Sequence, residues 1–216
     1  MRGHAASTAC KVTQRLLRYK TIPNPTSPHP RLIRLGETAC RNVLTGKPSC
    51  KDEARFGQKG RVCHRWFTRG QRPPGLCDQR YTWAHLFAAV RPATGQSFAL
   101  VLPDLSTEAM QVFLDLFATK LAADEQAVLV ADRAGWHIAE ALRIPDNVVL
   151  VYLPSYSPEL NPVERVWLYL RERHLSHRLL DGYDAIVDAL CHAWKQLTEE
   201  RFRSLTQYPY LNQVRV

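Results

Sequence analysis

Residues 127–153, AVLVADRAGWHIAEALRIPDNVVLVYL, decide the fold of this chain. They contain two short runs that are apolar throughout, 127–131 and 148–153, with a short helical pattern at 137–143 between them. Strands that are apolar throughout are covered on both faces of a sheet, and two strands joined by a helix pair in parallel. The stretch therefore predicts a parallel pair of strands inside a layered α/β fold.

Antiparallel strands are expected before this pair. Apolar and polar residues alternate at 62–66 and again at 81–89, which predicts two strands joined around GQRPPG (70–75). The run SFALVL (97–102) predicts a third strand of the same meander.

Three amphipathic helices complete the pattern. Apolar residues at helical spacing predict a helix over 107–122, and Ser106 is placed to cap it. Two longer helices are expected at 162–175 and 182–197. The fold class is therefore mixed α/β, with a three-strand antiparallel meander and parallel strands in one sheet flanked by helices.

The formal net charge of +9 comes from one end of the chain. Residues 1–51 contain ten Lys and Arg against the single acidic residue Glu37, whereas the remaining 165 residues carry 19 charges of each sign. The region 52–91 is locally basic, which fits a phosphate-binding surface and equally fits a solvated charged hairpin.

No membrane or secretory signal is visible. The longest apolar run, 148–153, is far shorter than the roughly 18 residues that cross a bilayer. The first residues lack the apolar region of a signal peptide, so we expect a cytoplasmic protein.

The first 51 residues do not predict a folded core. The segment TIPNPTSPHP (21–30) is rich in proline, and TGKPSCK (45–51) is polar with a proline inside it. The second segment predicts a loop and not a strand. We therefore divide the chain into a basic, proline-rich irregular leader, 1–51, and a folded domain, 52–216.

The six cysteines do not have the spacing of a zinc site or a redox motif. Free thiols are the expected state. A metal site built from Cys50, Cys63, His64 and Cys77 is a less favoured alternative, because the spacing of these ligands is irregular.

Two acidic residues stand where chemistry is often placed. Asp132 ends the first apolar strand, and ligands of open α/β sheets bind at such strand ends. An aspartate there equally fits a simple turn. Glu164 lies at the edge of the buried stripe of the helix at 162–175, where it can face Asp132, but NPVE (161–164) also fits a capping box.

Three blocks of sequence resemble a known family. LPSYSPELNPVERVW (153–167), VADRAGWH (130–137) and DEARFG (52–57) are similar, in this order, to the DDE transposases of bacterial insertion sequences in the mariner superfamily, of the IS six-thirty type. The resemblance extends from residue 52 to about residue 210.

The resemblance implies an RNase H-like catalytic domain that cleaves and transfers DNA strands. Its metal ligands carry over onto Asp52, Asp132 and Glu164. The implied cofactors are two Mg²⁺ or Mn²⁺ ions, since these cations prefer hard oxygen ligands and two ions about 4 Å apart can clamp a phosphoryl transfer. The implied partners are double-stranded DNA, both element ends and target, and a second copy of the chain in a homodimer.

The resemblance also suggests which residues contact DNA. Basic side chains in and after the first block are expected to neutralise backbone phosphates, and a histidine of the second block is expected at the scissile phosphate. Each of these residues equally fits a structural role, as a charged surface group or, for the histidine, as part of the packing. The residues are Arg55, Lys59, Arg61, Arg65 and His137.

Two departures from the family point to a damaged chain. The family carries an apolar strand directly before DEARFG, and here TGKPSCK stands in its place, so the strand that should hold Asp52 is expected to be missing. Arg133 replaces the small or amide residue expected after the second aspartate. These features predict an N-terminally truncated or frame-shifted derivative whose leader lacks the DNA-recognition helices of the family.

Two functions remain open at this point. The chain is an active metal-dependent nuclease and strand transferase if the first strand is formed. Otherwise it is a catalytically inactive remnant that binds DNA only non-specifically, through the leader and residues 55–72. An RNase H-like nuclease unrelated to transposition is a third, weaker interpretation.

Overall fold

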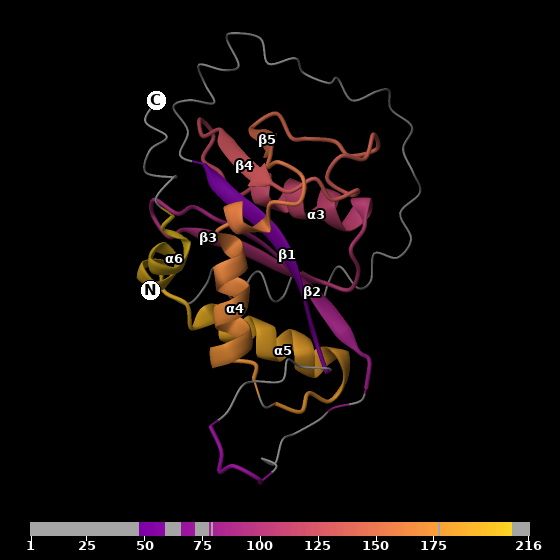
Figure 1. Cartoon of the computed structure of the whole chain (residues 1–216). Coiled ribbons are helices and arrows are strands. Elements are labelled where there is room, and N and C mark those ends of the chain that lie inside the picture. Colours follow the sequence, from indigo (N-terminus) through magenta and orange to yellow (C-terminus); the bar gives the residue numbers. More distant parts are fainter. Residues whose placement is uncertain (1–47, 59–65, 72–77, 79, 177, 209–216) are drawn as a thin grey trace, which may run out of the picture.

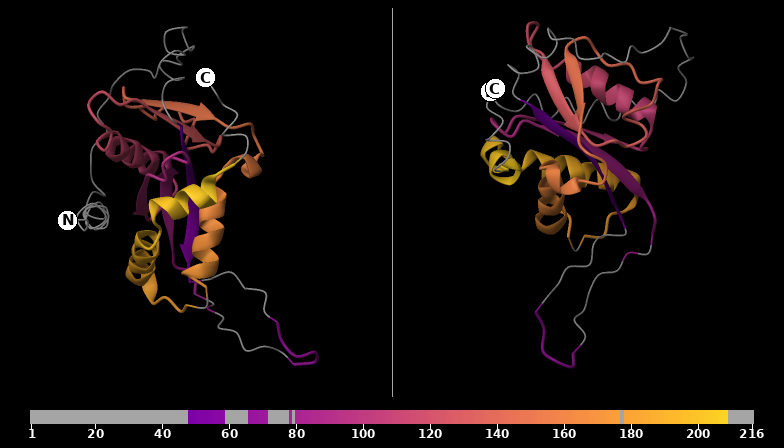
Figure 2. Two further views of the ribbon diagram at one scale, coloured as in Figure 1. Left: turned by 90° about the vertical axis from the view of Figure 1, so that its left-hand side faces the viewer. Right: turned by 45° about the horizontal axis from the view of Figure 1, so that its top comes forward.

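A five-strand sheet forms the centre of the molecule, with helices on both faces (Figures 1 and 2). This computed structural model describes residues 48–58, 66–71, 78, 80–176 and 178–208. The strand order is β3-β2-β1-β4-β5. The strands are β1 (Ser49–Gly57), β2 (Trp83–Val90), β3 (Ser97–Leu102), β4 (Ala127–Ala131) and β5 (Val148–Tyr152).

The predicted mixed sheet is confirmed. Strands β1, β2 and β3 form an antiparallel meander, while β4 pairs in parallel with both β1 and β5. The first strand of the meander is β1, however, and not the segment at 62–66 that the alternation suggested. Of that segment only Trp66 is described, and it lies outside any strand with its side chain fully exposed.

The prediction that TGKPSCK replaces a strand is wrong. Residues 49–51, assigned above to a loop and to the leader, begin β1, which is the central strand of the sheet and contains Asp52 as its fourth residue. Pro48 lies just before the strand, where its missing N–H costs no ladder hydrogen bond. The remainder of the proposed leader, residues 1–47, lies outside the described residues.

The helices form two layers around the sheet. Helices α4, α5 and α6 cover one face, and α3 covers the other (Figure 1). Their bounds are α3 (Thr107–Ala118), α4 (Val163–Arg173), α5 (Gly182–Lys195) and α6 (Glu199–Thr206), with a 3₁₀ turn at Pro158–Leu160.

One predicted helix is absent from the structure, and one helix of the structure was not predicted. Residues 137–143 form turns and no helix, because side chains hold the segment: His137 bonds back to Asp132, and Tyr152 Oη donates to the carbonyl of His137 at 2.7 Å. Helix α6 was missed because it is short. It begins at the cap Thr198 and buries Phe202.

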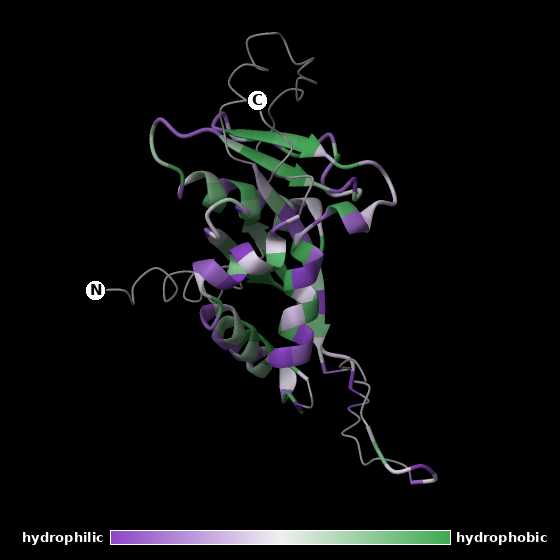
Figure 3. Cartoon of the chain, turned by 60° about the vertical axis from the view of Figure 1, so that its left-hand side comes forward, coloured by the Kyte–Doolittle hydropathy of each residue, from purple (hydrophilic) through white to green (hydrophobic). Residues whose placement is uncertain are grey.

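Each face of the sheet has its own hydrophobic core, and apolar residues are concentrated in the strands (Figure 3). On β1, residues 50, 54 and 56 pack against α4 and α5, so Asp52 points to that face as well. Lys51 points to the opposite face, beside the aromatic rings of the α3 layer. Lys51 and Asp52, which are neighbours on β1, therefore lie on opposite faces of the sheet.

Two remaining expectations concern the cysteines and the membrane. Cys50, which is buried, and Cys191, which is partly exposed, are free thiols as expected. Cys63, His64 and Cys77 lie outside the described residues. Within the part of the chain that the structure describes, no helix is long and apolar enough to span a membrane.

Candidate active site

The three predicted metal ligands come from three neighbouring elements. Asp52 lies on β1, Asp132 directly follows β4, and Glu164 is the second residue of α4. Cys50 pairs with Val130 in the parallel β1–β4 ladder, so Asp52 and Asp132 lie at the same level two residues further along. The topology thus brings all three carboxylates to one region of the sheet.

A hydrogen bond fastens the start of α4 to β1. Asn161 stands two residues before the first residue of α4, and its side-chain oxygen accepts from the N–H of that residue, Val163, at 3.2 Å. The amide nitrogen of the same side chain donates to the carbonyl of Lys51 at 3.2 Å. The backbone N–H of Asn161 donates to Pro158, so the capping box considered for Glu164 is not what satisfies this group. Glu164 itself is exposed and free to face a ligand.

Asp52 is a nearly buried carboxylate held by one strong hydrogen bond. Its exposed fraction is 7%, and the indole N–H of Trp167 donates to its Oδ2 at 2.7 Å. Burial, and next the negative charge of Glu164, raise the pKa of Asp52 to about 7, although the Trp167 hydrogen bond acts in the opposite direction. Asp52 is therefore partly protonated near neutral pH when no cation is bound.

The other two carboxylates differ in their electrostatics. Desolvation raises the pKa of Glu164, Arg171 opposes this shift, and the charge of Asp132 adds to it. The pKa of Asp132 is lowered, chiefly by its hydrogen bond to His137. Since Asp52 interacts with Glu164 and Glu164 with Asp132, the three carboxylates form one electrostatically linked set.

The donor set fits a hard divalent cation. All three side chains offer carboxylate oxygens, the ligands that Mg²⁺ and Mn²⁺ prefer. Among the described residues, no three His, Cys, Asp or Glu side chains are drawn together as a finished metal cluster. Like charges repel without a cation between them, and the raised pKa values of Asp52 and Glu164 express that repulsion together with burial.

A buried polar network lies beside the carboxylates, and sequence reasoning missed most of it. Glu53 Oε1 accepts from Lys51 Nζ, from the indole N–H of Trp136 at 3.3 Å, and lies 2.9 Å from His137 Nε2. The other ring nitrogen, His137 Nδ1, lies 2.8 Å from Asp132 Oδ1. Glu53 is part of DEARFG and could have been noticed there, whereas Lys51 was hidden in a segment taken for a loop.

Burial and charge set the pKa values of this network. Burial lowers the pKa of Lys51 and opposes the raising effect of Glu53. Burial would raise the pKa of Glu53, but the charge of Lys51 and the hydrogen bond from His137 outweigh it, so the pKa is lowered. Burial likewise opposes the hydrogen bonds of His137 to Asp132 and Glu53, which prevail and raise its pKa.

The predicted DNA-contacting residues are only partly described. Arg55 is exposed, with its guanidinium 5.0 Å from the centre of the Trp83 ring. Lys59, Arg61 and Arg65 lie outside the described residues. The side chain of His137 has no exposed surface, and both ring nitrogens have partners inside the protein, which favours an internal role over a phosphate contact.

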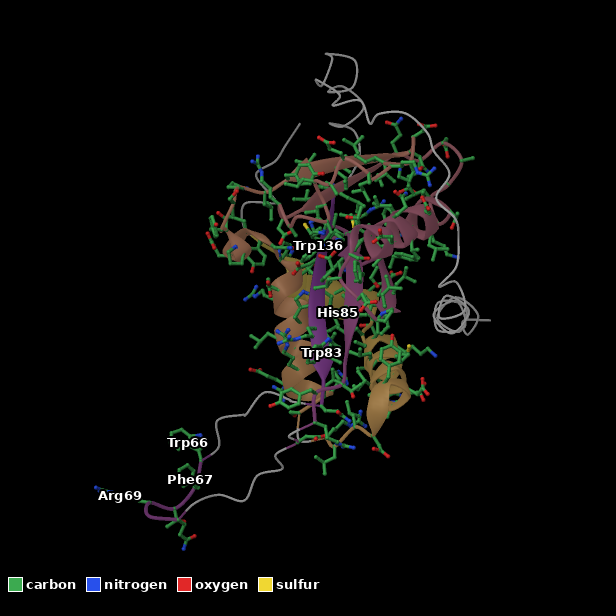
Figure 4. The ribbon with its side chains drawn as sticks, turned by 90° about the vertical axis from the view of Figure 1, so that its right-hand side faces the viewer. Trp66, Phe67, Arg69, Trp83, His85 and Trp136 are labelled. Carbon is green, nitrogen blue, oxygen red and sulfur yellow. The ribbon has the colours of Figure 1, made fainter. Side chains whose placement is uncertain are left out.

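The connection between β1 and β2 carries a second exposed group. Trp66, Phe67 and Arg69 lie far out on this connection, beyond the end of the sheet opposite to Trp136 (Figure 4). The side chains of Trp66 and Phe67 are exposed to solvent. This tip is therefore separate from the carboxylates, which lie near the beginning of β1.

Trp167→Phe tests the support of Asp52. The variant keeps a buried aromatic ring but removes the only N–H of the side chain, so a buried acceptor loses its donor. We expect a loss of about 1–3 kcal/mol in the free energy of unfolding, measured by urea denaturation at pH 8. Trp194→Phe is the matched control, since Trp194 contacts Trp167 and Phe202 through its ring. An equal loss in both variants would contradict a specific role of the Asp52 hydrogen bond.

The sequence of the chain is similar to a known family and to a bacterial protein. A family model described as "DDE superfamily endonuclease" matches residues 49–187. The uncharacterized protein y4pE/y4sA of Sinorhizobium fredii is 44% identical over 124 residues, which are 57% of this chain and 92% of that protein.

Solved structures of similar fold include complexes of the Mos1 transposase. A pre-cleavage Mos1 transpososome matches with a TM-score of 0.60 and 15% identity, covering 95% of this chain and 69% of that one. The Mos1 strand transfer complex matches with a TM-score of 0.58 and 15% identity, covering 95% and 66%. The chain thus spans about two thirds of the Mos1 chain. At this identity the likeness concerns the fold, which is the RNase H-like one that was predicted.

Proposed function

The chain belongs to the DDE superfamily endonuclease family, and from this premise we propose that it is the catalytic domain of a DNA transposase. The reaction is metal-dependent cleavage of a phosphodiester bond, followed by transfer of the strand end to a new site. The observation that carries the proposal is the presence of Asp52 on the central strand, level with Asp132 and electrostatically linked to Glu164.

In the proposed mechanism the protein supplies a site of three carboxylates. Asp52, Asp132 and Glu164 would hold two Mg²⁺ or Mn²⁺ ions, which supply activation of a water or 3′-hydroxyl and stabilisation of the leaving oxygen. Trp167 orients Asp52 through its indole N–H, and Asn161 keeps α4, with Glu164, against β1. Crystal structures of the Mos1 paired-end complex with Mn and with Mg support a divalent cation.

Double-stranded DNA is the proposed partner, at the ends of a mobile element and at a target. Complexes of Mos1 with transposon ends support this assignment. Of the described residues we propose Arg55, which is exposed beside the ring of Trp83, as a contact to a DNA phosphate. We further propose that the chain acts as a homodimer on DNA and that it does so at the nucleoid in the cytoplasm. We assign it to the bacterial IS six-thirty type. The relative in Sinorhizobium fredii supports a bacterial origin.

The structure removes one ground for the alternative of an inactive remnant. That alternative, and the hypothesis of truncation or a frame shift, rested in part on a missing first strand; the other grounds were the proline-rich leader and Arg133. Strand β1 is present and pairs on both sides, with β2 and with β4. The active enzyme is therefore the function that the geometry favours.

A nuclease assay on linear DNA in Mn²⁺ tests the proposal. We expect cleavage by the wild type and a loss of more than about 100-fold in Asp132→Asn and in Glu164→Gln, since removing even an outer partner of a ligand typically costs 10–100-fold. Glu159→Gln is the matched control: this exposed acid lies five residues before Glu164 and should leave cleavage unchanged. DNA binding that weakens with salt but leads to no cleavage would contradict the proposal and support the inactive remnant.

A further inference from the structure

We propose that Glu53 and His137 are positioning residues, forming a buried relay that fixes the orientation of the Asp132 carboxylate for metal binding. The inference rests on the proposed function, because it concerns one of the three proposed metal ligands. It assigns to His137 a role different from the phosphate contact considered above, and it assigns a role to Glu53 and Lys51, which the three-carboxylate mechanism does not use.

The relay consists of the side chains of Asp132, His137, Glu53 and Lys51. His137 lies between two carboxylates, with Nδ1 2.8 Å from Asp132 Oδ1 and Nε2 2.9 Å from Glu53 Oε1. Lys51 Nζ bonds to Glu53 and lies 2.5 Å from His137 Nε2. Metal-binding side chains are commonly oriented by such outer partners, and these partners control the affinity of the site.

The position of one proton of His137 follows from its neighbours. Nδ1 faces two acceptors of the same residue, the carboxylate Oδ1 and the backbone carbonyl of Asp132, the latter at 3.0 Å. A ring nitrogen between two acceptors must carry the proton, so Nδ1–H donates to Asp132. The far nitrogen, Nε2, meets Glu53 and Lys51, and these two residues hold the ring in place.

The relay connects buried side chains to Asp132, a proposed metal ligand whose side chain is exposed. The side chains of Lys51 and His137 are completely buried and that of Glu53 is 4% exposed, whereas the side chain of Asp132 is 53% exposed. An exposed carboxylate directly after a strand has rotational freedom that the buried ring removes. The N–H of Ala134 also donates to Oδ1 of Asp132, at 3.1 Å. Both bonds use Oδ1, so in the proposed site Oδ2 is the oxygen that would bind a cation.

The residues packed around Lys51, Glu53 and His137 hold these three side chains in place. Lys51 Nζ lies 5.3 Å from the centre of the Phe87 ring and 5.6 Å from that of Phe113, both wholly buried. Trp136, the residue next to His137, donates its indole N–H to Glu53. The backbone carbonyl of His137 accepts from Tyr152. The ring is therefore held through its side chain, through its own carbonyl and through its neighbour.

Two variants of His137 separate the two ends of the relay. The amide nitrogen of Asn stands as many bonds from the backbone as Nδ1, and that of Gln as many as Nε2. His137→Asn therefore keeps a donor for Asp132 and loses the link to Glu53, whereas His137→Gln keeps the link to Glu53 and loses the donor for Asp132. Both remove the imidazole, so each is the matched control of the other.

The primary measurement is the dissociation constant of Mn²⁺, determined by isothermal titration calorimetry on the full chain. We expect the constant to rise about 10–100-fold in His137→Gln and by a clearly smaller factor in His137→Asn. Equal losses in the two variants, or a larger loss in His137→Asn, would overturn the relay. The nuclease assay on the wild type separates failure of the relay from failure of the proposed function. If the wild type binds Mn²⁺ and cleaves DNA but the two variants lose affinity equally, only the relay is overturned. If the wild type neither binds Mn²⁺ nor cleaves DNA, the proposed function is overturned as well.

A second measurement needs no variant. In ¹⁵N NMR of the wild type, the ring of His137 should show a protonated Nδ1, and its signals should shift during a Mg²⁺ titration with the dissociation constant obtained by calorimetry. His192, exposed on α5, is the internal control and should not shift. Signals of His137 that do not respond to Mg²⁺, while the calorimeter records binding, would overturn the relay even if both variants failed to fold.

Discussion

Lys51→Met is expected to lower the free energy of unfolding by about 3–5 kcal/mol, the usual cost of removing one member of a buried ion pair. The side chain of Lys51 is completely buried and that of Glu53 nearly so. The substitution therefore leaves the buried Glu53 carboxylate without its ammonium partner. The contacts of the ammonium group with the rings of Phe87 and Phe113 are lost as well. Urea denaturation in EDTA at pH 7 measures the effect without any bound cation.

Two further variants show whether the charge is responsible. The double variant Lys51→Met with Glu53→Gln should recover part of the loss, since a neutral amide is cheaper to bury than an unpaired carboxylate. Lys120→Met, at an exposed position, should change stability by no more than about 0.5 kcal/mol. If Lys51→Met alone cost no more than Lys120→Met, Lys51 would not carry a charge that matters to the fold.

The second large effect is a pH dependence caused by Asp52. Burial raises the pKa of Asp52 from 3.8 to about 7 in the folded protein, so the native state binds a proton that the unfolded chain has already released. Stability from this group is fully present below pH 4 and is lost as pH rises towards and through 7. A shift of this size corresponds to about 4 kcal/mol.

The experiment compares the wild type with Asp52→Asn across this range. The variant carries no titrating group at position 52 but keeps an oxygen for the Trp167 hydrogen bond. In EDTA, the wild type should lose about 4 kcal/mol relative to Asp52→Asn between pH 4 and pH 8. Taking the difference cancels the contributions of Glu53 and Asp132, whose lowered pKa values act in the opposite sense.

Divalent cations should reverse this loss. A cation that binds only the native state stabilises it by mass action, and it neutralises the carboxylates that repel each other. In saturating Mn²⁺ the wild type should therefore hold its stability at pH 8. If, in EDTA, the stability of the wild type changed with pH in the same way as that of Asp52→Asn, the pKa of Asp52 would not be raised in the folded protein, and the prediction would be wrong.

Strands β4 and β5, and the acidic residue that follows β4, could be predicted from the sequence alone. The apolar runs at 127–131 and 148–153 predicted β4 and β5 and their parallel pairing, which is confirmed. Strand β4 is buried as an apolar run implies, whereas β5 is an edge strand and only Val148 in it is buried, so the expectation that both strands are covered on both faces is wrong for β5. Asp132 at the end of β4, and Glu164 at the start of α4, lie where these patterns and the resemblance placed them.

Strand β1 could not be recognised in this way. Its first half, SCKD, contains the polar residues Ser49, Lys51 and Asp52, which are buried in the folded protein. Local hydropathy cannot distinguish such a segment from a loop. Its polar side chains are acceptable in a central strand only because other residues satisfy them: the distant Trp167 bonds to Asp52, and Lys51 has the distant His137 and its strand neighbour Glu53 as partners.

The sequence by itself determined the sheet class and the parallel pair of strands, since apolar periodicity encodes these features within short segments, and through the family resemblance it supplied the three carboxylates that we propose as metal ligands. Only the tertiary structure decided that β1 exists, that Asp52 carries a raised pKa, and that Lys51, Glu53 and His137 form a network behind Asp132. The bonds that tie β1 to His137 and to Trp167 join residues 84 to 115 positions apart along the chain, and their burial and charge act only once the sheet has brought them together.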